Sequence, residues 1–141
     1  VADIGCDHGL LGIHLVKTKK VKEIIVSDIL PSALNNAREN ILKEDLVSSV
    51  YPKVGDGLEV IENDTNTITI SGMGTYTILK ILDNKKIDQI DKMVICSNMD
   101  YNLLRKSIIK KGFYIADEKI VFEKDNYYVV ILFQKLLLNL N

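Results

Sequence analysis

The stretch VADIGCDHGL, residues 1–10, has the pattern of a buried strand end, a tight glycine turn and a helix start. Gly5 and Gly9 stand where the backbone must turn or approach a ligand closely. A helix after the turn directs its N-terminal amides back toward it, which favours polar or negatively charged ligand groups. The stretch therefore predicts the first strand and ligand loop of an α/β sheet, although an ordinary strand-to-helix turn has the same pattern.

Asp7 separates this loop from the fingerprint of dinucleotide-binding folds. That fingerprint, Gly-x-Gly-x-x-Gly, has a glycine here so that the pyrophosphate can lie against the backbone. A carboxylate at this position repels a pyrophosphate. It suits a ligand with positive charge, such as the sulfonium and ammonium groups of S-adenosylmethionine. The loop therefore favours S-adenosylmethionine over NAD.

Length and composition predict a globular domain with a real core, since the chain has 141 residues and 47% are hydrophobic. The formal net charge of −1 neither requires nor excludes a nucleic-acid partner, because a local basic patch can act within a neutral domain. Cys6 and Cys96 form no disulfide framework, so we expect reduced thiols and a cytoplasmic protein. No metal-ligand spacing or membrane-spanning segment is visible, so we expect neither metal nor membrane and leave the oligomeric state open.

Strands and helices alternate along the chain. The expected strands are residues 1–4, 23–27, 49–54, 66–70, 92–96, 113–121 and 127–133, and the expected helices are residues 8–17, 32–43, 76–82 and 102–111, with a helical turn at 58–62. This alternation predicts a parallel sheet with right-handed crossovers. The last two strands are too close in sequence for a crossover helix, so they must form an antiparallel hairpin.

The predicted fold class is therefore α/β, with a mostly parallel seven-stranded sheet that ends in an antiparallel hairpin. This is the layout of Rossmann-like class I methyltransferases that use S-adenosylmethionine. We assign residues 1–135 to such a catalytic domain and residues 136–141 to the start of a truncated C-terminal helical segment. The first strand is already under way at Val1, so we also expect sequence before it.

Ligands of open α/β sheets bind outside the carboxyl ends of the strands. Asp28 follows the second strand at about the spacing of a carboxylate that accepts both ribose hydroxyls; alternatively it is an exposed turn acid. The third strand ends in Gly55-Asp56-Gly57, where the acid can accept from the exocyclic amine of adenine, unless this is a plain turn. The full predicted cofactor site is Asp3, Gly5, Asp28, Ile29, Gly55, Asp56, Gly57, Gly72 and Met73.

The fourth and fifth strands end in groups suited to the reacting part of a ligand. Gly72 lets the backbone pass close to a ligand, with Met73 as a flexible apolar wall, or else Ser71–Gly74 is only a tight turn. Asn98 could hold a base edge with its amide, or belong only to the turn that caps the next helix. Arg105 follows the fifth strand and is placed to meet phosphates.

Several of these segments occur together in one order, and with the hairpin pattern of residues 118–128 they resemble the TrmK family. The segments are Ala2-Asp3-Ile4-Gly5-Cys6-Asp7-His8, Gly55-Asp56-Gly57-Leu58, Ile70-Ser71-Gly72-Met73-Gly74, the Asn98 turn and Leu104-Arg105. That family comprises bacterial tRNA (adenine-N1)-methyltransferases that act on the adenine at position 22 in the D-loop. The resemblance covers nearly the whole chain. It implies a Rossmann-like domain, S-adenosylmethionine as methyl donor, tRNA as substrate and a C-terminal helical coiled-coil domain.

Two residues depart from the family pattern. Thr75 stands where the family usually has Gly, and Ser97 stands where it usually has Pro before the Asn that matches Asn98. The helix upstream of the first strand and the coiled-coil domain of the family also have no counterpart in the 141 residues.

Methylation of adenine N1 leaves a cationic base, so a nearby carboxylate would stabilise the transition state. Asp7 is the candidate for that catalytic role, and Asn98 is the candidate for holding the base edge. His8 and Arg105 are candidate substrate contacts, and no general base is assigned. The alternatives are a methyltransferase for another nucleobase or a small molecule, and a non-catalytic module that binds S-adenosylmethionine or a nucleotide.

Overall fold

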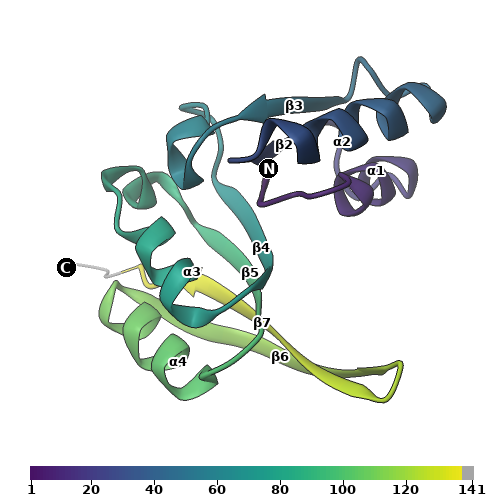
Figure 1. The fold of residues 1–141 in the computed structure, drawn as a ribbon. Helices are drawn as coiled ribbons and strands as arrows, with labels where there is room; N and C mark the ends of the chain where they lie inside the picture. The colour runs from purple at the N-terminus through teal and green to yellow at the C-terminus, as the bar shows by residue number, and fades with distance from the viewer. Residues whose placement is uncertain (138–141) are drawn as a thin grey trace.

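The computed structural model describes residues 1–137 and contains one seven-stranded sheet with helices on both faces (Figure 1). The strands are β1 (Ala2–Ile4), β2 (Ile24–Asp28), β3 (Val50–Val54), β4 (Thr67–Met73), β5 (Lys92–Ser97), β6 (Phe113–Glu123) and β7 (Asn126–Lys135). The helices are α1 (Leu10–Lys17), α2 (Pro31–Lys43), α3 (Thr75–Leu82) and α4 (Tyr101–Lys110), with the short 3₁₀ helices η1 (Gly57–Val60) and η2 (Lys85–Gln89).

The strand order is β3-β2-β1-β4-β5-β7-β6, so the predicted fold class is confirmed. Strands β1 to β5 pair in parallel, and β7 pairs antiparallel with both β5 and β6. The chain reverses between β6 and β7 through Lys124 and Asp125, whose positive φ values suit a two-residue hairpin turn. Figure 1 shows this hairpin extending well beyond the rest of the sheet.

Two apolar clusters hold the layers together, one on each face of the sheet. One cluster joins α1 and α2 to the sheet through Ile13, Leu34 and Val26. The larger cluster joins α3 and α4 to the other face, with Ile70 and Ile108 fully buried in it. Alternate residues of a strand point to opposite faces, so apolar β-branched side chains in the central strands feed both clusters.

The structure corrects three local predictions. The first helix begins at Leu10 and not at residue 8, because Asp7 and Gly9 adopt positive φ values of 51° and 73° that a right-handed helix excludes. The fourth strand runs on to Met73, so a tight turn at residues 71–74 is wrong, and Gly72 lies within a bulged strand. The short helix η2 was not predicted.

The C-terminal helical segment is not helical where the structure describes it. Leu136 and Leu137 follow β7 without helix or strand conformation, and the rest of the predicted segment, residues 138–141, lies outside the described residues.

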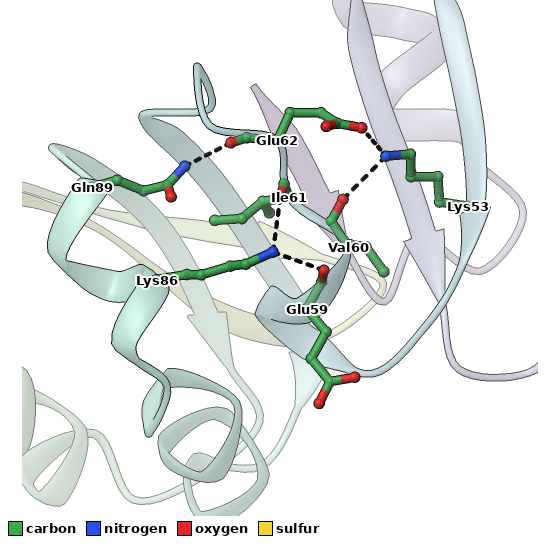
Figure 2. A network of polar contacts seen from close by, with 7 residues as sticks. All are labelled: Lys53, Glu59, Val60, Ile61, Glu62, Lys86 and Gln89. Atoms are coloured by element: carbon green, nitrogen blue, oxygen red, sulfur yellow. Dashed lines mark hydrogen bonds and ion pairs between the residues drawn. The ribbon is translucent and has the colours of Figure 1, made fainter.

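A polar network links η1 and the residues just after it to β3 on one side and to η2 on the other (Figure 2). Lys86 donates from its Nζ to the carbonyl oxygens of Glu59 at 2.9 Å and Ile61 at 3.1 Å. Lys53 contacts the Glu62 carboxylate, and Gln89 Nε2 donates to the Glu62 carbonyl oxygen at 2.6 Å. These bonds satisfy carbonyl groups that a helix end leaves without partners, so they steady the segment that carries Gly57 and Leu58.

The packing of α4 yields a paired stability prediction. Ile108 is 0% exposed and its neighbour Ile109 is 51% exposed. Ile108→Ala should lower the free energy of unfolding by about 2–5 kcal/mol, because it leaves a cavity between α4 and the sheet. Ile109→Ala, the matched control, should change it by no more than about 0.5 kcal/mol. Urea denaturation of both variants measures the difference, and equal losses would contradict this packing.

Candidate functional site

A cavity of about 370 Å³ opens at the carboxyl edge of the sheet. Its volume lies in the range of small-molecule sites, about 300–1,000 Å³. The lining residues come from the ends of β1, β2, β3 and β4, from η1, and from α3 and the residues just after it. They are Ile4, Gly5, Ser27, Asp28, Ile29, Gly55, Asp56, Gly57, Leu58, Glu59, Met73, Thr77, Lys80, Ile81, Asp83 and Asn84.

The turn after β1 forms one wall of the cavity, and its backbone conformation at Gly5 is one that residues with a side chain rarely adopt. Gly5 has a φ of +75°, and a Cβ atom there would collide with the Cε methyl of Met73. The backbone amide of Cys6 donates to the Ser27 carbonyl oxygen at 2.7 Å, which ties the turn to β2. The turn therefore presents bare backbone to the cavity, with the Met73 side chain packed against it.

Asp28 lies at the end of β2 with its carboxylate fixed by two backbone amides. Its Oδ2 accepts from the amide of Asp7 at 3.1 Å, and its Oδ1 accepts from the amide of Leu30 at 3.1 Å. A carboxylate oxygen can accept more than one bond, so both oxygens can still receive hydroxyl groups from a ligand. The geometry thus holds the acid in a single orientation while leaving it available to the cavity.

Asp3 lies in β1, beside the cavity but not in its lining, and is only 3% exposed. Burial raises the pKa of its carboxyl above the ordinary 3.8. The Oγ1 hydroxyl of Thr69 donates to this carboxylate at 2.6 Å and partly lowers the pKa again, whereas the negative charge of Asp28 raises it further. Burial also raises the pKa of the Cys6 thiol to about 12, with the charge of Asp3 acting in the same direction. Cys6 is therefore a thiol and not a thiolate nucleophile at neutral pH.

Asp7 and His8 lie on the outer surface of the glycine turn. Both are exposed, and the Nε2 atom of His8 lies 3.6 Å from Oδ1 of Asp7. The carbonyl oxygen of His8 accepts from Nδ2 of Asn40 at 2.9 Å, which fastens the turn to α2. Neither side chain lines the cavity, so both are placed to meet a second molecule that approaches from solvent.

Asn98 lies in the loop between β5 and α4, with its side chain exposed. Its backbone amide donates to the Met73 carbonyl oxygen at 2.8 Å, so the ends of β4 and β5 meet here. The residue that caps α4 is Asp100, whose Oδ1 accepts from the amide of Leu103 at 3.4 Å. Asn98 itself is thus not the cap, but it lies in the turn that carries the cap, so its role in holding a base edge stays a prediction.

Arg105 is held by an acidic neighbour from the hairpin. Its Nε and Nη2 atoms each lie 2.8 Å from Oε1 of Glu118. A phosphate would have to compete with this carboxylate for the guanidinium group. The role of Arg105 as a phosphate contact stays a prediction.

The structure brings most of the predicted cofactor residues into one cavity, and it adds others that the sequence reasoning missed. Seven of the nine line the cavity, while Asp3 and Gly72 do not. The missed residues Thr77, Lys80, Ile81 and Asn84 recur at helical spacing along α3 and just beyond it. That periodicity would have identified a helix face turned toward the strand ends.

The described part of the chain contains neither a candidate metal site nor a candidate membrane-spanning helix. Within residues 1–137 no group of three or more His, Cys, Asp or Glu side chains is arranged to hold a metal ion. No helix in the same range is long and apolar enough to cross a membrane.

Comparison with known proteins identifies the class of this chain. A model described as a methyltransferase domain matches residues 1–131. A tRNA (adenine(22)-N(1))-methyltransferase from Bacillus subtilis (strain 168) is 30% identical over 135 residues, which are 94% of this chain and 57% of the relative. The chain thus spans a little over half the length of that relative.

Solved structures agree in fold over nearly the whole chain. The M. capricolum TrmK, solved in complex with S-adenosyl-homocysteine, is 36% identical with a TM-score of 0.86, over 95% of this chain and 61% of that one. The Streptococcus pneumoniae protein Sp1610, titled a putative tRNA (m1A22) methyltransferase and solved in complex with S-adenosyl-L-methionine, is 25% identical with a TM-score of 0.90. That match covers 99% of this chain and 67% of the S. pneumoniae chain.

The burial of Asp3 predicts a pH-dependent gain in stability from its replacement. Because its pKa is raised in the folded state, the wild type loses stability as the pH rises from 3.8 through the folded pKa, and this cost persists at pH 7. Asp3→Asn removes the charge, so its melting temperature should exceed that of the wild type at pH 7, and the gap should narrow toward pH 4.

The exposed carboxylate of Asp64 provides the control. Asp64→Asn removes the same charge from the surface and should give little change in the melting temperature at either pH. Scanning calorimetry at both pH values decides the matter. A constant gap for Asp3→Asn, or a lower melting temperature at pH 7, would contradict a destabilising buried carboxylate.

Proposed function

Because the chain belongs to the methyltransferase domain family, we propose that it transfers a methyl group from S-adenosylmethionine to N1 of the adenine at position 22 of a tRNA. The observation that carries the proposal is the cavity at the carboxyl edge of the sheet, where Asp28, Asp56 and a bare glycine turn face one small-molecule space. The names of the Bacillus subtilis and Streptococcus pneumoniae relatives support the tRNA substrate.

The residues that line the cavity fit S-adenosylmethionine. Asp28 would accept the two ribose hydroxyls, and Asp56 would accept the exocyclic amine of the adenine ring. The apolar side chains of Ile29 and Leu58 also line this space and would cover the ring faces. The methionine part would lie along the turn at Gly5 and the flexible side chain of Met73, and a carboxylate-rich lining suits its positive charge.

When bound, S-adenosylmethionine supplies an electrophilic methyl group on sulfur, and its sulfonium becomes a neutral thioether as the methyl leaves. The protein contributes alignment, because an in-line displacement depends on the position of the nucleophile. The side-chain oxygen of Asn98 can accept from the exocyclic amine of the target base and so leave its N1 lone pair free. N1 carries no proton, so the reaction needs no general base. Asp7 would stabilise the positive charge that develops on the base.

The target adenine has to leave its stack to meet these groups, because N1 lies on the pairing edge of the base. Asp7, His8 and Asn98 are all exposed, so an extruded base can reach them without opening the protein. Arg105 would contact the tRNA backbone if Glu118 releases it. A cytoplasmic location suits this substrate, and Cys6 and Cys96 are both free thiols in the structure.

Cofactor choice gives the first functional prediction. Isothermal titration calorimetry should show binding of S-adenosylmethionine and of S-adenosylhomocysteine, and none of NAD. Asp28→Ala should weaken the binding of S-adenosylmethionine by about 1.5–3 kcal/mol, which is the cost of losing hydrogen bonds to a charged group. Asp64→Ala, at the opposite end of the strands, is the control and should bind normally. Tight NAD binding without binding of S-adenosylmethionine would overturn the cofactor assignment, and unchanged affinity in Asp28→Ala would remove Asp28 from the ribose site.

The second functional prediction concerns catalysis. The wild type should transfer a radiolabelled methyl group to a tRNA transcript with adenine at position 22 and not to the same transcript with guanine there. Asp7→Ala and Asn98→Ala should each lower the maximum rate about tenfold or more, and far more than they lower the affinity for S-adenosylmethionine, because both act on the transition state.

Other outcomes point to the alternatives. Label on both transcripts would indicate another nucleobase or position, and S-adenosylmethionine binding without any transfer would indicate a binding module. Near wild-type rates in both variants would remove Asp7 and Asn98 from the catalytic site.

A further inference from the structure

Two buried hydroxyl groups meet where α3 begins and β5 ends. Thr75 is the first residue of α3 and is 0% exposed, and Ser97 is the last residue of β5 and is 1% exposed. Their side-chain oxygens lie 2.8 Å apart. Buried hydroxyls are costly unless they are hydrogen-bonded, so a pair of them at a strand end has to be satisfied locally.

Both hydroxyls lie within hydrogen-bond distance of the backbone of the loop that carries Asn98. The carbonyl oxygen of Met99 lies 2.6 Å from Oγ1 of Thr75 and 2.9 Å from Oγ of Ser97, and the amide of Met99 donates to Oγ of Ser97 at 3.4 Å. Each hydroxyl has one proton. The shortest contacts are used when Thr75 donates to Met99 and Ser97 donates to Thr75, which forms a closed ring through both side chains and the Met99 backbone.

This ring restrains Asn98 through its two neighbours. Ser97 precedes Asn98 and Met99 follows it, and the amide of Asn98 is itself bonded to the Met73 carbonyl oxygen at 2.8 Å. The structure gives the side chain of Asn98 no hydrogen bond to any described residue. The point from which this side chain projects is therefore set by the loop backbone, to which Thr75 and Ser97 are hydrogen-bonded.

We propose that Thr75 and Ser97 are positioning residues that hold the Asn98 loop in the geometry needed to present the target base, an inference that rests on the proposed function. The hydroxyl pair restrains the loop by hydrogen bonds to the Met99 backbone.

The test separates loop position from cofactor binding. Thr75→Val keeps the shape of the side chain and removes its hydroxyl, and Thr75→Ser keeps the hydroxyl. Single-turnover methyl transfer to the tRNA transcript, with enzyme in excess, gives the maximum rate, and calorimetry gives the affinity for S-adenosylmethionine. Thr75→Val should lower the maximum rate about five- to tenfold, the scale of one lost hydrogen bond with its partner left unpaired. The affinity of Thr75→Val for S-adenosylmethionine should stay within about twofold of the wild-type value. Thr75→Ser should retain a near wild-type maximum rate.

Matched variants complete the experiment. Thr67→Val removes a hydrogen-bonded threonine hydroxyl at the far end of β4 and should leave the rate unchanged. Ser97→Ala should reproduce Thr75→Val, and the double variant should lose little more than either single one, because both break the same ring. If Thr75→Val does not fold, Ser97→Ala carries the same test.

The outcomes distinguish the two proposals. A wild type that binds S-adenosylmethionine but methylates no tRNA defeats the proposed function. An active wild type with unchanged maximum rates in Thr75→Val and Ser97→Ala overturns only the positioning role. A rate loss matched by an equal loss of cofactor affinity, or additive losses in the double variant, also overturns it.

Discussion

The left-handed turn after β1 is the constraint on which the site depends. Three residues of this turn, Gly5, Asp7 and Gly9, have positive φ, a backbone conformation that residues other than glycine rarely adopt. The turn is tied to β2 through the Cys6 amide on the Ser27 carbonyl, and through the Asp7 amide on the Asp28 carboxylate. Because one acid both fastens the turn and faces the cavity, the shape of the loop and the position of the candidate ribose acceptor are set together.

Much of this arrangement could be predicted from local pattern. Apolar strands that alternate with helices determine a parallel sheet, and parallel strands bring their carboxyl ends to one edge, so seven cavity residues follow from where strands end. Contacts between distant side chains could not be predicted in the same way. Arg105 meets Glu118 only because α4 packs beside the bulged hairpin, and Thr75 meets Ser97 only because a bulge carries β4 on to Met73.

The region around the cavity is more acidic than the net charge of the whole chain would suggest. The net charge is only −1, yet Asp3, Asp7, Asp28 and Asp56 all lie in or beside the strand ends that form the cavity. Burial makes the charge on Asp3 costly, so the fold keeps a destabilising group beside its binding site. A concentration of carboxylates is unfavourable for a pyrophosphate and favourable for a cationic ligand. This acidic edge therefore favours a cationic ligand, and one of its acids, Asp3, carries a cost in stability.

The site has two parts that differ in how far they are enclosed: the cavity proposed for the cofactor and the exposed surface proposed for the substrate. The cofactor half is a cavity whose polar groups are already fixed by backbone amides, as Asp28 shows. The half assigned to the substrate consists of Asp7, His8 and Asn98, which are exposed and lie outside that cavity. An exposed amide has many rotamers, so Asn98 can meet a base reproducibly only if its backbone is held. In the proposed arrangement, the ring through Thr75, Ser97 and Met99 supplies that restraint and leaves the surface open, as a large nucleic-acid substrate would require.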